Sequence, residues 1–228
     1  MKELHSWDVD VQRAVQIQET LRQQLILKNV FSKIKTIGGA DVSYSNGDHL
    51  VGTIVVFSYP DLKQVESSSV RGKTPFRYIP GLLAFREGPI LIKAFQKLKA
   101  NPDVMLFEGQ GIAHPKGFGM ASHLGLWLDI PSIGCTKTPL VATDITVGTS
   151  KGQWQPILKD GVEVGAVVRT KTNVKPVFVS PGHKIDLATS IQIILETSRD
   201  ARLPEPLRRA DAVSRQLLAK GIAQGAWR

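Results

Sequence analysis

Four acidic residues occupy positions where a carboxylate could do chemistry. Asp41 lies inside an apolar run, and Glu108 follows the apolar run 103–107. Glu87 lies near the start of a predicted helix, and Asp211 lies inside another predicted helix. Because a buried carboxylate is costly unless it is paired, hydrogen-bonded or bound to a metal, these positions need an explanation.

Convergence on a divalent cation is one explanation for all four. Mg²⁺ prefers oxygen ligands and keeps several waters, so a few carboxylates from strands and helices suffice. Two such ions, about 3.5–4 Å apart, can activate water and stabilise the leaving oxygen of a phosphodiester. The chain has 29 Lys+Arg against 20 Asp+Glu, a net charge of +9. A basic surface around an acidic metal centre is the layout expected of a nuclease.

Each acid also has an ordinary explanation. Asp41 could belong to the exposed face of a half-buried strand, and Glu108 could be a loop acid. Glu87 could complement a helix dipole. Asp211 could pair with the arginine three residues before it or four residues after it. The sequence leaves these alternatives open.

Composition and charge exclude several classes of protein. A hydrophobic fraction of 42% over 228 residues is that of a globular chain, which we expect to form a single domain over residues 1–228. No apolar run is long enough for a membrane span, and the first residues lack the apolar core of a signal peptide. The lone Cys135 permits neither an intramolecular disulfide nor a cysteine-cluster zinc site, which predicts a reducing, cytoplasmic location.

The positive charge is concentrated in two segments. Residues 71–100 carry +6 and residues 201–228 carry +4. These could be solvated helix faces, or they could follow the phosphates of a nucleic acid.

The elements that must position these residues follow an α/β pattern. Apolar periodicity predicts a first helix over 8–29 and three consecutive strands over 36–44, 50–57 and 63–71, with a turn at Asn46-Gly47. Further predicted strands are 103–107, 132–136, 163–169 and 177–180, and further predicted helices are 82–99, 121–129, 185–198 and 206–221. Pro89 is expected early in its helix. An antiparallel meander followed by β-α-β units predicts a mixed sheet flanked by helices.

Several motifs, in this order, make the chain similar to the endonuclease V family. They are Gly39-Ala40-Asp41-Val42-Ser43, Tyr78-Ile79-Pro80-Gly81 with Phe85-Arg86-Glu87, Gly109-Gln110-Gly111 with His114-Pro115, Ala121-Ser122-His123, Ile133-Gly134 with Lys137, Gly182-His183, and Leu203-Pro204-Glu205-Pro206. The resemblance implies an RNase H-like fold with a mixed five-stranded core sheet. It also implies a DNA repair endonuclease that cuts the second phosphodiester bond 3′ of deoxyinosine, leaving 3′-hydroxyl and 5′-phosphate ends.

The resemblance also implies roles for the acidic and basic residues. Asp41 and Glu108 would bind Mg²⁺, for which Mn²⁺ could substitute, and Glu87 and Asp211 would complete the centre. Lys137 would contact the scissile phosphate. His114 would bind phosphate or assist the departing oxygen, or else pack on Pro115 as a loop residue. We expect His123 and His183 to be structural.

A wedge and a base pocket are implied as well. Tyr78, with Ile79 and Pro80, would fill the gap left by a base that leaves the stack; a core aromatic is the alternative. The flipped hypoxanthine would enter a pocket made largely of backbone, around Gly81, Leu82, Leu83, Gly109, Gly119 and Met120.

Two positions depart from the family pattern. Glu108 stands where the family usually has Asp, and its extra methylene moves the carboxylate by roughly 1.5 Å. Arg77 stands where the wedge motif more often has Pro. The expected partner is inosine-containing DNA, double- or single-stranded, bound by a monomer. Three alternatives remain: a lesion-binding protein with weak catalysis because of Glu108, an inosine-specific ribonuclease, and a general RNase H-like nuclease.

Overall fold

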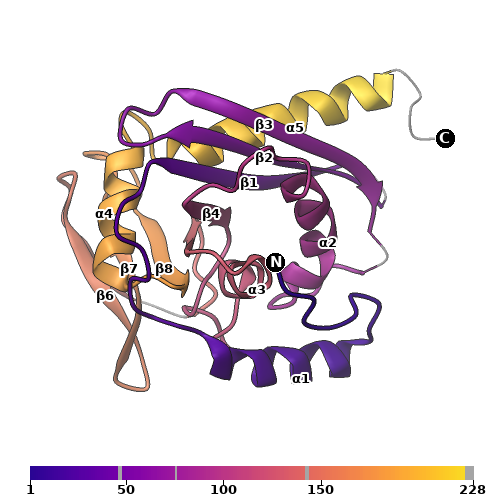
Figure 1. Ribbon diagram of the computed structural model, residues 1–228. Coiled ribbons are helices and arrows are strands. Elements are labelled where there is room, and N and C mark those ends of the chain that lie inside the picture. Colours follow the sequence, from indigo (N-terminus) through magenta and orange to yellow (C-terminus); the bar gives the residue numbers. More distant parts are fainter. Residues whose placement is uncertain (46–47, 75, 142–143, 224–228) are drawn as a thin grey trace.

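A computed structural model describes residues 1–45, 48–74, 76–141 and 144–223 (Figure 1). The turn expected at Asn46-Gly47 lies outside these residues. The helices are α1 (Val11–Leu21), followed by the short 3-10 helix η1 (Arg22–Gln24), α2 (Leu83–Phe95), α3 (Met120–Leu128), α4 (Leu187–Thr197) and α5 (Glu205–Ala223). The strands are β1 (Thr36–Tyr44), β2 (His49–Ser58), β3 (Gln64–Lys73), β4 (Val104–Glu108), β5 (Ser132–Thr136), β6 (Trp154–Lys159), β7 (Val162–Val168) and β8 (Val177–His183).

The described strands form one mixed sheet in the order β3-β2-β1-β4-β5-β8-β7-β6. Strands β1, β4 and β5 are parallel to one another, and all the other pairings are antiparallel. The predicted mixed sheet is therefore confirmed, and β3 lies at one edge of it.

The sheet has eight strands in the described residues rather than the predicted five, because β8, β7 and β6 extend it at one end. Strand β6 was not predicted at all. It contains Pro156, and its only buried residue is Ile157, so its apolar pattern is weak. Pro156 and Lys159 are residues that commonly protect an edge strand from further pairing.

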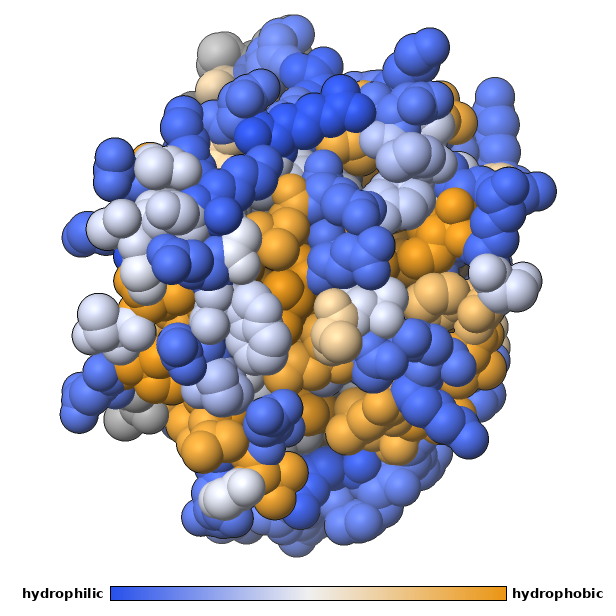
Figure 2. Space-filling model, turned by 90° about the vertical axis from the view of Figure 1, so that its left-hand side faces the viewer, coloured by the Kyte–Doolittle hydropathy of each residue, from blue (hydrophilic) through white to orange (hydrophobic). Residues whose placement is uncertain are grey.

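Alternation along the strands divides the core between two helical layers. Ala40, Met105 and Phe107 face α2 and α3, whereas Ile37 and Leu106 face the other layer, with α4 and the start of α5. In Figure 1, α5 runs along β1, β2 and β3 on the side of the sheet opposite α2. Figure 2 views the side that carries α4, β6 and β7 and shows apolar patches separated by hydrophilic side chains.

Two predicted helix details are wrong. The first helix ends at Leu21, with η1 reaching only Gln24, so it is shorter than the predicted 8–29. Helix α2 begins at Leu83, which makes Pro89 an interior residue rather than an early one. Pro89 has no N–H to donate to the carbonyl four residues before it. Among the described residues, no helix combines the length and apolar character needed to cross a membrane.

Gly39 allows the start of α5 to touch β1. A Cβ built on Gly39 would lie 2.3 Å from the carbonyl carbon of Pro206 and 2.4 Å from its oxygen. Both atoms belong to backbone, so a side chain at position 39 would push α5 away from the sheet. Any residue that α5 contributes to a site on β1 depends on this close approach.

We expect Gly39→Ala to destabilise the protein by about 1–3 kcal/mol, because overpacking forces backbone shifts. Chemical denaturation measures the loss. The matched control is Gly152→Ala, since no atom lies within 4 Å of a Cβ built there, although its positive φ adds local strain. Unchanged stability in Gly39→Ala would contradict the close packing.

Candidate active site

The register of two parallel strands brings Asp41 and Glu108 together. Ala40 on β1 pairs with Phe107 on β4, so the next residues along each strand are Asp41 and Glu108. Neighbouring strands lie about 4.8 Å apart, and both side chains alternate onto the α5 face. Both carboxyl groups line the same cleft, and the charge of Glu108 raises the pKa of Asp41. Two acids at this separation favour a shared proton or a bound cation.

Helix α5 holds the Asp41 side chain in place. Asp41 is only 8% exposed, and its Oδ2 accepts a hydrogen bond of 2.8 Å from the Ser214 hydroxyl. The Ser214 oxygen also lies 2.7 Å from the Ser43 hydroxyl and 2.9 Å from the Asp211 carbonyl. Asp41 is therefore not on an exposed strand face, so that alternative is wrong.

Glu87 approaches the same region from helix α2. Its Oε1 accepts a hydrogen bond of 2.6 Å from the Tyr44 hydroxyl, and the Tyr44 ring lies 4.7 Å from the Arg86 guanidinium. Arg86 in turn donates to the Phe76 carbonyl at 2.7 Å. The first turn of α2 contains no acid, so the helix-dipole alternative for Glu87 is wrong.

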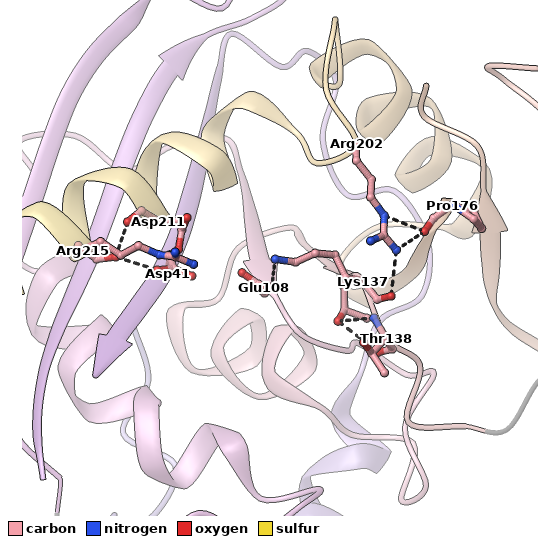
Figure 3. A network of polar contacts seen from close by, with 10 residues as sticks. Asp41, Glu108, Lys137, Thr138, Pro176, Arg202, Asp211 and Arg215 are labelled. Carbon is pink, nitrogen blue, oxygen red and sulfur yellow. Dashed lines mark hydrogen bonds and ion pairs between the residues drawn. The ribbon is translucent and has the colours of Figure 1, made fainter. Parts of the chain in front are cut away.

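Two basic residues lie beside the acids, and a third holds the backbone next to one of them (Figure 3). Lys137, which follows β5, has its Nζ 3.6 Å from Glu108 Oε1. Arg215 Nε lies 2.6 Å from Asp211 Oδ1, so the predicted helical pairing of Asp211 is present. Arg202 donates to the Lys137 carbonyl at 3.0 Å and to the Pro176 carbonyl at 2.7 Å, which fixes the backbone from which Lys137 extends.

The acids line one cleft of about 680 Å³. Its walls include Asp41, Glu87, Glu108, Lys137, Asp211 and Arg215. Burial raises the pKa of Asp41 to about 7, against the hydrogen bond from Ser214, and the charges of Glu108 and Asp211 raise it further. Burial likewise raises the pKa of Glu87 to about 8, against the Tyr44 hydrogen bond and with the charges of Asp41 and Glu108 adding to it.

The donor set fits a hydrated divalent cation rather than a closed protein cage. In the described part of the chain, no three Asp, Glu, His or Cys side chains form a ready-made metal cluster. Mg²⁺ commonly uses one or two carboxylates and completes its shell with water and phosphate oxygens. Asp41 and Glu108 supply such a pair, and burial, with a smaller contribution from the neighbouring carboxylates, raises the pKa values of Asp41 and Glu87.

A second pocket of about 240 Å³ adjoins the cleft. It is lined by Gly81, Leu83, Gly109, Gly119 and Met120 from the predicted base pocket, and by Tyr78 and Ile79 from the predicted wedge. Leu83, Gly109, Met120 and Thr136 line both cavities. Gly81 has a φ of +87°, which favours glycine at this turn.

Pro80 of the predicted wedge and Leu82 of the predicted base pocket do not line the second pocket, whereas Tyr78 is exposed at its rim. Pro80 and Leu82 line a neighbouring hollow against α1, and the Leu82 side chain is buried among apolar residues of α1 and α2. Tyr78 is 65% exposed at the rim of the second pocket, so it is not a core aromatic.

His114 lies in the second pocket and not in the cleft of the carboxylates. Its Nδ1 accepts a hydrogen bond of 3.1 Å from the Lys116 backbone, and its ring lies against Gly81. Burial lowers the pKa of His114 to about 4. A neutral ring packed against Gly81 is better suited to holding the turn at residues 78–81, the wedge turn, than to assisting a departing oxygen.

The other two histidines are packed away from both cavities. His123 is fully buried, with its Nε2 2.6 Å from His5 Nε2 and its ring among Trp7, Phe85 and Phe118. His183 accepts a hydrogen bond from the Ile26 backbone.

The sequence did not point to several residues that line these cavities or hold their lining residues in place. Tyr44, Ser214, Arg202 and Gln18 act through contacts 26 or more positions apart in sequence. Ser43 and Tyr44 lie two and three residues after Asp41, and the strand alternation could have placed Tyr44 on the face opposite Asp41. Gln18, in contrast, carried no signal beyond its place in an amphipathic helix.

The comparisons with known proteins agree with this arrangement. The family model of Endonuclease V matches residues 19–212. The chain belongs to the endonuclease V family. Endonuclease V of Dictyoglomus turgidum is 48% identical over 211 residues, which is 92% of each chain.

Solved endonuclease V structures share the fold. That of Bacillus subtilis has a TM-score of 0.92 at 32% identity and covers 98% of both chains. That of Ciona intestinalis, in complex with a 24mer DNA containing an inosine followed by a ribo-adenosine, has a TM-score of 0.82 at 33% identity. It covers 92% of this chain and 99% of its own.

The raised pKa values of the two buried acids predict how the free energy of unfolding depends on pH when EDTA keeps the site free of divalent cations. The ordinary pKa values of Asp41 and Glu87 are 3.8 and 4.5, so between pH 9 and 7 only the folded chain takes up protons at these groups. Stability should therefore rise as the pH falls from 9 to 7. Below pH 6.5, the lowered pKa values of His114 and His183 act in the opposite direction. Urea denaturation in EDTA at pH 7, 8 and 9 measures the slope.

Glu87→Gln is the control for this profile. It keeps an acceptor for Tyr44 but cannot titrate, so the slope should become smaller. A wild-type midpoint that is constant from pH 9 to 7 would contradict the uncompensated charge in the cleft.

Proposed function

We propose that the chain is a metal-dependent endonuclease that recognises deoxyinosine in DNA and hydrolyses the second phosphodiester bond 3′ of it. Membership of the endonuclease V family and the inosine-containing DNA in the Ciona intestinalis relative support this function. The observation that carries the proposal is that Asp41 and Glu108, at the adjacent ends of two parallel strands, line one cleft that shares a wall with a second, base-sized pocket.

Asp41 and Glu108 are the residues that would hold Mg²⁺ or Mn²⁺, with Glu87 and Asp211 completing the negative wall. The bound cation would supply Lewis-acid stabilisation of charge on the phosphate and a lowered pKa for water. Ser214 keeps the Asp41 carboxylate oriented, and Tyr44 does the same for Glu87. These hydrogen bonds arrange the oxygens before substrate arrives.

Lys137 is the basic residue placed to neutralise the scissile phosphate. Its Nζ lies 3.6 Å from Glu108, so the ammonium is already inside the cleft. It is 45% exposed and free to exchange the carboxylate for a phosphate oxygen. Arg215 occupies the α5 side of the same cleft and is paired with Asp211.

The second pocket is suited to a flipped base. Tyr78 lies at its rim, where the exposed ring can enter the stack and fill the gap left by the base. Backbone around Gly81, Gly109 and Gly119 can approach a base edge closely. Hypoxanthine lacks the 2-amino group of guanine and the 6-amino group of adenine, so a tight backbone pocket would leave those groups unpaired or clashing.

Asp41→Asn tests the catalytic proposal. The substitution keeps the size and the hydrogen bond with Ser214 but removes a charge from the cation site. We expect nicking 3′ of deoxyinosine in Mg²⁺ or Mn²⁺ to fall at least about 100-fold, with binding of the same duplex retained. A wild-type protein that leaves the inosine duplex intact with either metal would overturn the proposed function, and EDTA is the control.

Glu108→Asp tests whether the longer side chain limits catalysis. The backbone places Glu108 beside Asp41, and Lys137 already pairs with it, so the site accommodates Glu. We expect Glu108→Asp to change nicking by less than about tenfold, since the structure is built around the longer side chain. A large gain, with unchanged DNA affinity, would instead support a lesion-binding protein with weak catalysis. Matched inosine RNA in the same assay tests the ribonuclease alternative.

A further inference from the structure

Gln18 on α1 is a buried amide that lines the second pocket and hydrogen-bonds to two of its walls. Its side chain is 1% exposed and lines the pocket. Its Nε2 donates one hydrogen bond of 2.8 Å to the Gly81 carbonyl and another of 2.9 Å to the Phe118 carbonyl. A single side-chain nitrogen therefore joins two segments that lie 37 residues apart, at positions 81 and 118.

The two carbonyls belong to opposite walls of the pocket. Gly81 ends the wedge turn and precedes Leu83 at the start of α2. Phe118 precedes Gly119 and Met120 at the start of α3. Both segments are loops just before a helix, so no sheet pairing fixes their separation.

The orientation of the amide follows from these contacts. With the amide reversed, Oε1 would face two carbonyl oxygens and lose both hydrogen bonds, so Nε2 must be the atom that points to them. Oε1 is then left buried with no partner in the described residues. An unpaired buried oxygen is unfavourable, and an apolar side chain would avoid it. The amide therefore serves the two carbonyls and not the packing of α1.

We propose that Gln18 is a positioning residue that sets the separation of the two walls of the second pocket and thereby its preference for hypoxanthine. This inference rests on the proposed function, since it assigns the flipped base to that pocket. Neither Gly81 nor Phe118, the two hydrogen-bond partners of Gln18, lines the carboxylate cleft, so we expect its effect to be confined to the base. The His114 ring also packs against Gly81 at the same turn.

The test compares duplexes that differ only at the recognised nucleotide. Affinity is measured in EDTA, so that nothing is cut, for duplexes with deoxyinosine, deoxyguanosine or a reduced abasic site. Gln18→Met keeps the length and helix propensity of the side chain but cannot donate. We expect it to lower the inosine-to-abasic affinity ratio about tenfold, the effect of losing two hydrogen bonds, with the abasic affinity unchanged within about twofold.

Two further variants keep the test decisive. Gln18→Asn retains an amide that is too short to bridge both carbonyls, and it should show the same selective loss. Gln12→Met, on the exposed side of α1, is the matched control and should behave as wild type. Equal weakening on all three duplexes would indicate a merely structural role and overturn the inference, as would an unchanged ratio in Gln18→Met. If wild type itself does not distinguish inosine from guanine, the proposed function fails together with the inference.

Discussion

Repulsion between carboxylates is the interaction on which the rest of the site depends. Parallel pairing of β1 with β4 forces Asp41 beside Glu108, and α2 adds the buried Glu87. In a partly buried cleft such charges interact more strongly than in water, and burial itself disfavours the ionised carboxylates. Burial raises the pKa values of Asp41 and Glu87, and the neighbouring carboxylates raise them further. The hydroxyls of Ser214 and Tyr44 act in the opposite direction, and Lys137 pairs with Glu108.

The α5 helix links this electrostatic arrangement to the packing of the fold. The backbone of Pro206 lies directly on Gly39, two residues before Asp41 on the same face of β1. One and two turns further along α5 come Asp211 and Ser214, which reach the same cleft and the Asp41 carboxylate. The motif Leu203-Pro204-Glu205-Pro206, which contains the start of α5, therefore sets the distance between a helix and a strand that share the acidic site.

Local sequence patterns were sufficient for the meander, the parallel strands and most helices, since these follow from strand alternation and helical periodicity. They were also sufficient to single out Asp41 and Glu108, because an acid within or after an apolar strand is conspicuous. Strand β6 was missed because it buries only Ile157 and pairs on one edge. Tyr44, Ser214 and Gln18 could not be assigned because their partners come from distant segments. His114 follows Glu108 closely in sequence, yet the loop carries it into the second pocket.

The wall shared by the two cavities has a geometric consequence. Leu83, Gly109, Met120 and Thr136 line both the cleft and the pocket, and Gly109 follows Glu108 directly in the chain. On the proposed function, the distance between the recognised base and the reacting phosphate is therefore set by the protein and not by the DNA. The DNA strand is anchored by its flipped base in the pocket. The bond that is cut is then the one that lies at this fixed distance, whatever the neighbouring bases are.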